Sequence, residues 1–147
     1  MIELLVVLGI IALVVGMGTP AFLRFNASLR LKSTTRQVAE SLQIARSQAI
    51  TLRKPCSVVF DLTRRRVTAV NDASGEALHT PVALPDSIKL AQPGQPDGSG
   101  IEFDDAKITF LSTGGTKGRT GAVWLSDAQG TAQKIIVYSS TGRVVLE

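Results

Sequence analysis

The sequence predicts an α+β fold in which one long N-terminal helix packs on antiparallel β-sheets. Two observations predict this fold. Helical patterning runs from the N-terminus to about residue 54, and short β-branched segments separated by turn residues then follow from Cys56 to the C-terminus. The chain has 147 residues. Setting aside its apolar first segment leaves roughly 120 residues, which suits a single compact head domain.

The first segment is apolar over the length that a membrane requires. No charged residue occurs in the 20 positions between Glu3 and Arg24. At helical rise this run is about 30 Å long, the thickness of the hydrocarbon core of a bilayer. A secretory signal peptide would instead begin with basic residues and have a shorter apolar core. We therefore expect residues 1–26 to form the membrane-spanning half of the helix, in which the Glu3 carboxylate needs a partner.

The stretch Ile2-Glu3-Leu4-Leu5-Val6-Val7-Leu8-Gly9-Ile10-Ile11 resembles a known N-terminal segment. It is similar to that of type IV pilins and type II secretion pseudopilins, whose mature chains typically begin Phe-Thr-Leu-Ile-Glu-Leu. Glu3 matches the nearly universal glutamate of this family, and Pro20 matches the proline that bends or breaks its helix, whereas Met1 stands where the family has leucine. Residues 42–50 also resemble the minor pseudopilin H and FimT-like subfamily.

The resemblance implies that Glu3 acts in filament assembly. In this family a prepilin peptidase acts on the precursor, the new N-terminus is methylated, and the glutamate is thought to neutralise the N-terminal ammonium of a neighbouring subunit. Opposite charges attract far more strongly in the low-dielectric core of a filament than in water. Glu3 would thus set the axial register of the subunits. The alternative is a carboxylate that rests at the level of the lipid headgroups.

After Arg24 the pattern becomes amphipathic. Apolar and small residues recur at alternating spacings of four and three, which places them on one helical face: Leu31, Thr35, Val38, Leu42, Ala45, Ala49 and Leu52. We expect this helix over residues 28–54, ended by Pro55 and by its restriction of Lys54. The apolar and amphipathic parts would form one interrupted rod, with the helix break at Gly16, Gly18 and Pro20.

The head is expected over residues 27–147, with its sheets in residues 56–147. Cys56–Leu62 and Arg65–Val70 predict a hairpin. Residues 81–100 hold four of the six prolines and predict a surface loop around a short strand at Ser87–Leu90. Further strands are predicted at Ile101–Phe103, Lys107–Leu111, Ala122–Ser126, Lys134–Tyr138 and Arg143–Leu146. Their spacing favours a sandwich or paired antiparallel sheets with the helix along one face.

The sequence contains no motif typical of an enzyme, so we expect neither catalysis nor a cofactor. The glycine-rich stretch 113–121 lacks the spacing of a Walker loop and has predicted strands on both sides. His79 is the only histidine, which excludes a histidine-rich metal cluster. The pair Asp104-Asp105 is typical of a turn. Cys56, the only cysteine, is predicted to be a small buried residue in a strand.

Positive charge is concentrated in residues 24–66, which carry a net +8, whereas residues 67–147 carry −3. Basic residues here suit acidic neighbours or the anionic headgroups of inner membrane lipid. Nucleic acid is the other partner that such charge fits, although we do not favour it. Two surfaces would carry DNA binding. One is a helix stripe of Arg30, Lys32, Arg36, Arg46 and Arg64–Arg66, and the other, more exposed in a filament, is the loop group Lys117, Arg119 and Arg143.

The resemblance to the pilin and pseudopilin family leads us to expect a minor pseudopilin at or near the tip of a type II secretion pseudopilus. It would be held in the bacterial inner membrane by a single pass, with its head in the periplasm, and its partners would be other minor and major pseudopilins or pilins. One alternative is a FimT/FimU-like minor pilin that primes a type IV pilus. Another is a DNA-binding minor pilin of natural transformation, although Val144, Val145 and the terminal Glu147 depart from the basic C-terminal end of such pilins.

Overall fold

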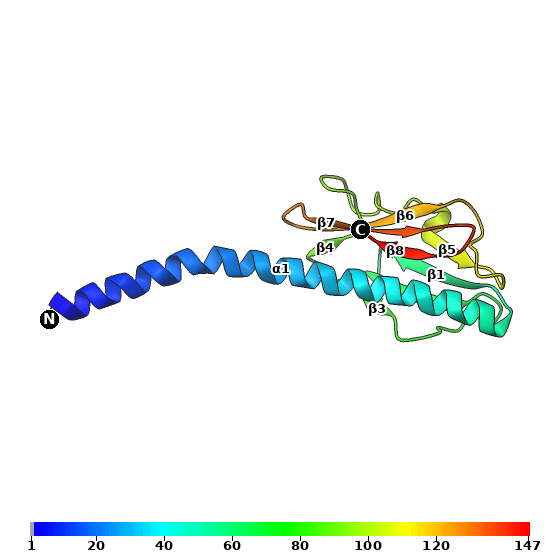
Figure 1. Cartoon of the computed structure of the whole chain (residues 1–147), viewed down its shortest axis with the longest axis horizontal. Coiled ribbons are helices and arrows are strands. Elements are labelled where there is room, and N and C mark those ends of the chain that lie inside the picture. Colours follow the sequence, from blue (N-terminus) through cyan, green and yellow to red (C-terminus); the bar gives the residue numbers. More distant parts are fainter. Residues whose placement is uncertain (1) are drawn as a thin grey trace.

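The computed structural model describes residues 2–147, with side chains described for residues 2–13 and 25–147. Helix α1 (Ile2–Leu52) is followed by strands β1 to β8 and by a short 3-10 helix, η1 (Asp104–Ala106). Figure 1 shows that the strands gather along the C-terminal half of α1, whereas its N-terminal half extends away from them. The predicted α+β fold, a long helix with antiparallel sheets, is confirmed.

From Leu31 onward, α1 buries one face against the sheets. The buried side chains follow the spacing that the sequence predicts: Leu31, Thr35, Val38, Leu42, Ala45 and Ala49. The hydroxyl of Thr35 donates to the Leu31 carbonyl oxygen at 2.8 Å, so this buried polar group is satisfied within the helix. Leu52, the last member of the expected face, is instead exposed. The helix ends at Leu52, two residues earlier than expected, because Arg53 adopts a positive φ of 51°.

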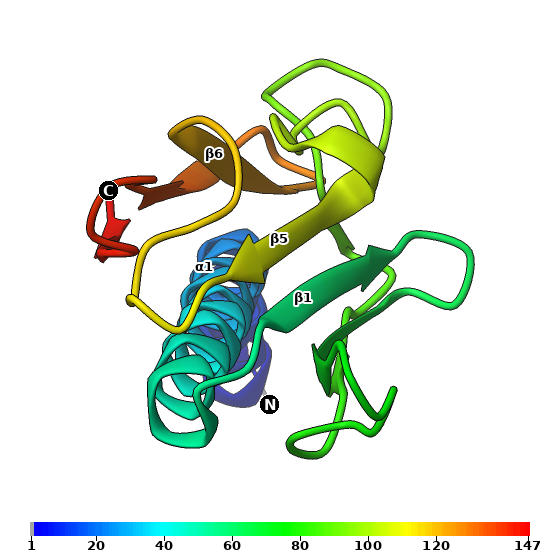
Figure 2. The ribbon, with the colours of Figure 1, turned by 90° about the vertical axis from the view of Figure 1, so that its right-hand side faces the viewer.

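The strands form two four-stranded antiparallel sheets. The first has the order β3-β2-β1-β5, and the second has the order β4-β6-β7-β8. Their bounds are β1 (Cys56–Asp61), β2 (Arg66–Asn71), β3 (Val82–Ala83), β4 (Ile88–Lys89), β5 (Lys107–Phe110), β6 (Gly121–Asp127), β7 (Ala132–Val137) and β8 (Val144–Leu146). Figure 2 looks along α1 and shows β1 and β5 to one side of the helix and β6 to the other. Buried side chains of the helix and both sheets form one continuous core.

Most of the predicted strands are confirmed, but one prediction is wrong. Residues Ile101–Phe103 form no strand, because only Ile101 makes an isolated bridge, to Val123. The chain then turns through η1, where Asp105 has a positive φ of 56°. Strand β3 was not expected from the sequence. It lies at the edge of its sheet, where no further strand needs the backbone N–H groups that the neighbouring prolines lack.

Cys56 is buried at the start of β1, as the sequence predicts. Burial, and then the negative charge of Asp72, raises the pKa of this thiol. Because the folded-state pKa lies above that of the unfolded chain, the unfolded thiol ionises first as the pH rises. The thiol therefore lowers stability only in alkaline solution, above its ordinary pKa, and stays in its unreactive protonated form near neutrality.

Candidate functional site

Residues 2–13 of α1 form an apolar surface that the rest of the described chain leaves uncovered. Its large apolar side chains are exposed by 53% to 76%: Ile2, Leu4, Leu5, Val6, Val7, Leu8, Ile10, Ile11 and Leu13. Soluble monomers rarely expose a continuous apolar surface of this kind, so these residues need covering by something other than this head.

Glu3 lies in the first turn of α1, within this apolar surface, and is exposed. An acidic side chain in the first turn interacts favourably with the positive end of the helix dipole. None of the ion pairs found in the described residues includes Glu3. The assembly role that the resemblance implies for Glu3 stays a prediction.

The expected helix break at Gly16, Gly18 and Pro20 falls in segment 14–24, whose side chains lie outside the described residues. In the part of the chain that the structure does describe, α1 offers no stretch that is both long enough and apolar enough to cross a membrane.

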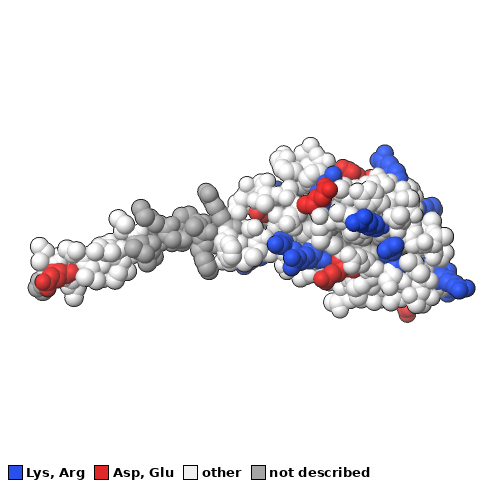
Figure 3. Space-filling model, viewed as in Figure 1, with Lys and Arg blue, Asp and Glu red and all other residues white. Residues whose placement is uncertain are grey.

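The basic stripe expected along α1 is not one continuous charged surface. Arg30, Lys32 and Arg36 are exposed, but Gln37 and Glu40 line the same hollow of this helix as Lys32 and Arg36. Figure 3 shows one face of the head, on which basic groups are scattered and acidic groups lie between them. Such interspersed charge suits contact with a mixed protein surface better than with a uniformly negative polymer.

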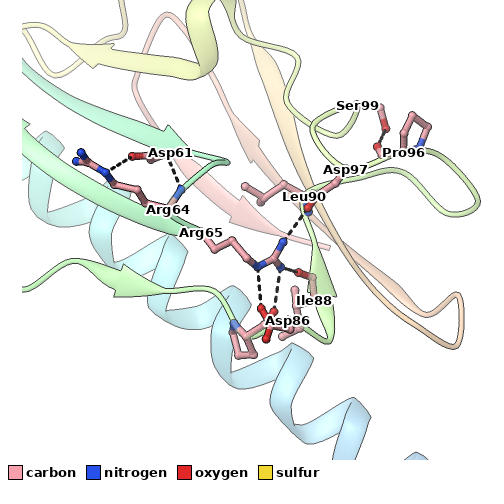
Figure 4. Close-up of polar contacts among 10 residues, drawn as sticks. Asp61, Arg64, Arg65, Asp86, Ile88, Leu90, Pro96, Asp97 and Ser99 are labelled. Carbon is pink, nitrogen blue, oxygen red and sulfur yellow. Dashed lines mark hydrogen bonds and ion pairs between the residues drawn. The ribbon is translucent and has the colours of Figure 1, made fainter.

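Arg65, which the sequence placed in the basic stripe, pairs with other groups of the head (Figure 4). It lies in the turn between β1 and β2, and its Nη1 meets Asp97 Oδ2 at 2.9 Å. Its Nη2 donates to the carbonyl oxygens of Pro85, at 3.0 Å, and Ile88. The other carboxylate oxygen of Asp97 accepts the backbone N–H of Leu90 at 2.8 Å. Arg65 thus ties the first sheet to the strand β4 of the second.

The three residues of the expected DNA-contact group lie on two turns that contact each other, since the Thr116 N–H donates to the Ser139 carbonyl oxygen and the Ser139 N–H donates to Thr120 Oγ1. Lys117, Arg119 and Arg143 are all exposed. Lys117 lines a hollow with Asp104 and Asp105, whereas Arg143 lines a different groove beside α1. The acidic neighbours of Lys117 weaken its attraction for a phosphate backbone.

The groove at Arg143 also contains a basic residue that the sequence placed elsewhere. Arg46, on α1, donates from Nε to the carbonyl oxygen of Gly114 at 3.1 Å. Gly142 packs against the same carbonyl at a positive φ of 61°, so closely that a Cβ atom would overlap the oxygen. The sequence features that could have indicated this contact are Gly114 and Gly142, because a glycine without a Cβ atom lets the two turns pack closely.

Ser41 and His79 meet although they are 38 residues apart in the sequence. His79 Nε2 lies 2.9 Å from Ser41 Oγ, and its Nδ1 donates to the carbonyl oxygen of Thr80 at 2.6 Å. Ser41 Oγ also lies 3.0 Å from the Gln37 carbonyl oxygen, so its single proton is shared between this oxygen and His79 Nε2. Since Nδ1 faces a backbone carbonyl and not a carboxylate, this pair differs from a catalytic serine and histidine. The contact joins the segment between β2 and β3, which carries His79, to α1, which carries Ser41.

In the described residues, no group of three or more histidine, cysteine, aspartate or glutamate side chains is placed to hold a metal ion. The side-chain contacts described above instead join elements of the head to one another.

The sequence of the head matches one protein family. The model of that family, described as type II transport protein GspH, matches residues 34–142. The chain belongs to the GspH family. No curated protein matches it in sequence. The family match confirms the resemblance to the pseudopilin H subfamily, and it begins after the N-terminal motif, so two separate parts of the chain indicate one family.

Solved structures support the fold of this GspH-family chain. The minor pseudopilin EpsH from the type 2 secretion system of Vibrio cholerae is similar with a TM-score of 0.59 and 15% identity, covering 80% of this chain and 96% of EpsH. The type IV minor pilin FimU of Pseudomonas aeruginosa is similar with a TM-score of 0.62 and 17% identity, covering 84% of this chain and 92% of FimU. At these identities the similarity establishes the pilin-like fold.

Proposed function

We propose that this chain is a minor pseudopilin of a type II secretion system, a structural subunit without catalytic activity, placed at or near the tip of the pseudopilus. The observation that carries the proposal is the GspH family match over residues 34–142. Its fold supports the same function, because one of the similar structures is a type II minor pseudopilin. The exposed apolar surface of residues 2–13 adds to this support, since a filament of packed helices would cover it.

In this proposal, residues 1–26 hold the subunit in the inner membrane before assembly, and the head 27–147 lies in the periplasm. The support is the uncharged run between Glu3 and Arg24, whose length matches the hydrocarbon core of a bilayer. The partners are other minor and major pseudopilins, the surrounding lipid and, on the precursor, prepilin peptidase.

Deleting the gene in the source bacterium tests the proposed machine. We expect loss of protein secretion through the type II system while type IV pili still form, and restoration of secretion by the gene in trans. Secretion is measured as the enzyme activity of secreted proteins in culture supernatants, and pili are counted by electron microscopy. Loss of pili with normal secretion would instead show the FimU-like alternative, a minor pilin that primes a type IV pilus, which the similarity to FimU favours.

The substitution Glu3→Ala tests the proposed assembly role of this carboxylate. We expect the variant to insert into membranes as the wild type does, because the change removes a charge from an apolar segment. We also expect its cross-linking to neighbouring subunits to fall about tenfold or more, because a charge pair in a low-dielectric core is lost. Membrane fractionation measures insertion, and cysteine cross-linking measures incorporation.

Glu40→Ala serves as a control, since it removes a carboxylate from the exposed face of the same helix within the head. Equal cross-linking of the wild type and the Glu3→Ala variant would remove Glu3 from the assembly mechanism. A variant that fails to reach the membrane would show that Glu3 acts in insertion instead.

A further inference from the structure

Strand β8 forms an open edge of the second sheet. Among the described residues it pairs with β7 alone, in the order β4-β6-β7-β8, and it lies beside α1 in Figures 1 and 2. In this ladder the carbonyl oxygen of Arg143 accepts the Tyr138 N–H, and Glu147 both donates to and accepts from the backbone of Lys134. Because bonding alternates along an antiparallel strand, the N–H and C=O groups of Val144 and Leu146 point outward, away from β7. A row of outward donors and acceptors is a template for another strand.

A groove lies where this edge meets α1. Its volume is about 470 Å³, and it is lined by Gln43, Arg46, Ser47, Ile50, Gly142, Arg143 and Val144. The lining combines apolar side chains with polar ones from a helix and from the start of β8. A strand added beside β8 would direct alternate side chains into this groove.

The groove is positively charged. It is lined by Arg46 and Arg143, and no acidic side chain of the described residues lines it. The hydrogen bond from Arg46 Nε to the Gly114 carbonyl oxygen fixes this side chain, and its terminal nitrogens make no ion pair with a described residue. The two guanidinium groups are therefore available to carboxylates.

We propose that an extended acidic segment of a partner protein binds here, adding a strand to the outer edge of β8 and placing its carboxylates at Arg46 and Arg143. The edge supplies backbone hydrogen bonds, and the groove supplies selectivity for acidic side chains at alternate positions. This inference goes beyond the proposed function, because it concerns the head alone and holds for a secretion or a pilus machine. A peptide fits these features better than nucleic acid, which would use neither the strand edge nor the apolar wall formed by Ile50 and Val144.

The test uses the full chain in detergent micelles and a fluorescent peptide, acetyl-Thr-Val-Glu-Val-Glu-Val-Thr-amide. We expect its anisotropy to report saturable binding that weakens with added salt, because the groove is open to solvent. The matched peptide with lysine in place of both glutamates should not bind. Absence of binding by the acidic peptide, or equal binding of both peptides, would overturn the proposal.

Three variants separate the two parts of the site. Arg143→Gln removes one guanidinium, and Leu146→Pro removes one outward N–H without removing a bond to β7. Each should weaken peptide binding about tenfold, because a charged contact or an edge hydrogen bond is lost. Arg119→Gln is the control, since this exposed cation lies outside the groove, and it should bind as the wild type does.

Two further measurements test whether the Arg143→Gln variant folds and whether the groove binds DNA instead of a peptide. The fluorescence of Trp124, the single tryptophan, should show the same urea unfolding curve for Arg143→Gln and the wild type. Peptide binding that survives both Arg143→Gln and Leu146→Pro would overturn the proposal. A single-stranded DNA oligonucleotide that binds through Arg143 while the acidic peptide does not would assign the groove to nucleic acid instead.

Discussion

The substitution Leu42→Ala is expected to lower the free energy of unfolding of the head by about 2–5 kcal/mol. Leu42 is fully buried on the face of α1 that packs on the sheets, and it belongs to the core that the helix shares with both of them. Removing its side chain costs the transfer free energy of the lost methyl and methylene groups and leaves a cavity between rigid elements. Helix propensity does not offset this loss, since leucine and alanine are both good helix formers.

Leu52→Ala is the matched control, because it makes the same chemical change in the same helix at a side chain that is 44% exposed. Its effect should be about 0.5 kcal/mol or less. Urea unfolding of the full chain in detergent, followed by Trp124 fluorescence, measures both variants. Similar losses at the two positions would mean that the buried face of α1 does not hold the sheets together.

The head portion of α1 was predictable because a helix encodes its buried face in local spacing. Leu31, Val38 and Leu42 recur at intervals that only one helical face can satisfy, and the structure buries all three. The position of Arg53, which ends the helix with a positive φ, is not visible in such spacing. Helix ends depend on the conformation of single residues and are therefore predicted less well than helix faces.

Strands with a long alternating sequence pattern could be predicted, whereas the predictions failed for segments that pair over only one or two residues. The hairpin of β1 and β2 pairs six residues on each side. Strand β3 has only two residues, and its pairing with Arg66 and Val67 depends on how a proline-rich loop returns to the sheet. Ile101–Phe103 has β-forming residues, yet the backbone turn at Asp105 allows only one bridge. Tertiary placement, and not local preference, decides such short segments.

The candidate surfaces were predictable only where a motif or a local pattern defines them. Glu3 stands in a recognisable N-terminal segment, and its proposed role depends on that segment alone. The basic residues of the head gave no such information, because sequence position does not show which cation is already paired. Arg64 and Arg65 are neighbours, yet the first is 76% exposed and the second is 29% exposed. The difference arises from the fold of a loop more than 20 residues further along the chain, which carries Asp97.

Arg65→Met is expected to lower the free energy of unfolding by about 2 kcal/mol, because the carbonyl oxygens of Pro85 and Ile88 lose a charged donor. The Asp97 pair is partly exposed and adds less than a buried pair would, and the pair with the fully exposed Asp86 adds little. Methionine keeps the length of the side chain, and its backbone would be as strained as that of arginine at the positive φ of 50°.

Arg64→Met separates the specific contacts of Arg65 from the general loss of a positive charge. Its side chain is exposed, and its ion pair with Asp61 is long, at 3.9 Å, so its replacement should change the free energy of unfolding by about 0.5 kcal/mol or less. Trp124 fluorescence in urea reports the difference, because Trp124 lies on β6, the strand that pairs with β4. Equal stability of the Arg65→Met and Arg64→Met variants would mean that Arg65 does not join the two sheets. A loss confined to Arg65→Met would identify its turn as the joint that holds β4 against the first sheet.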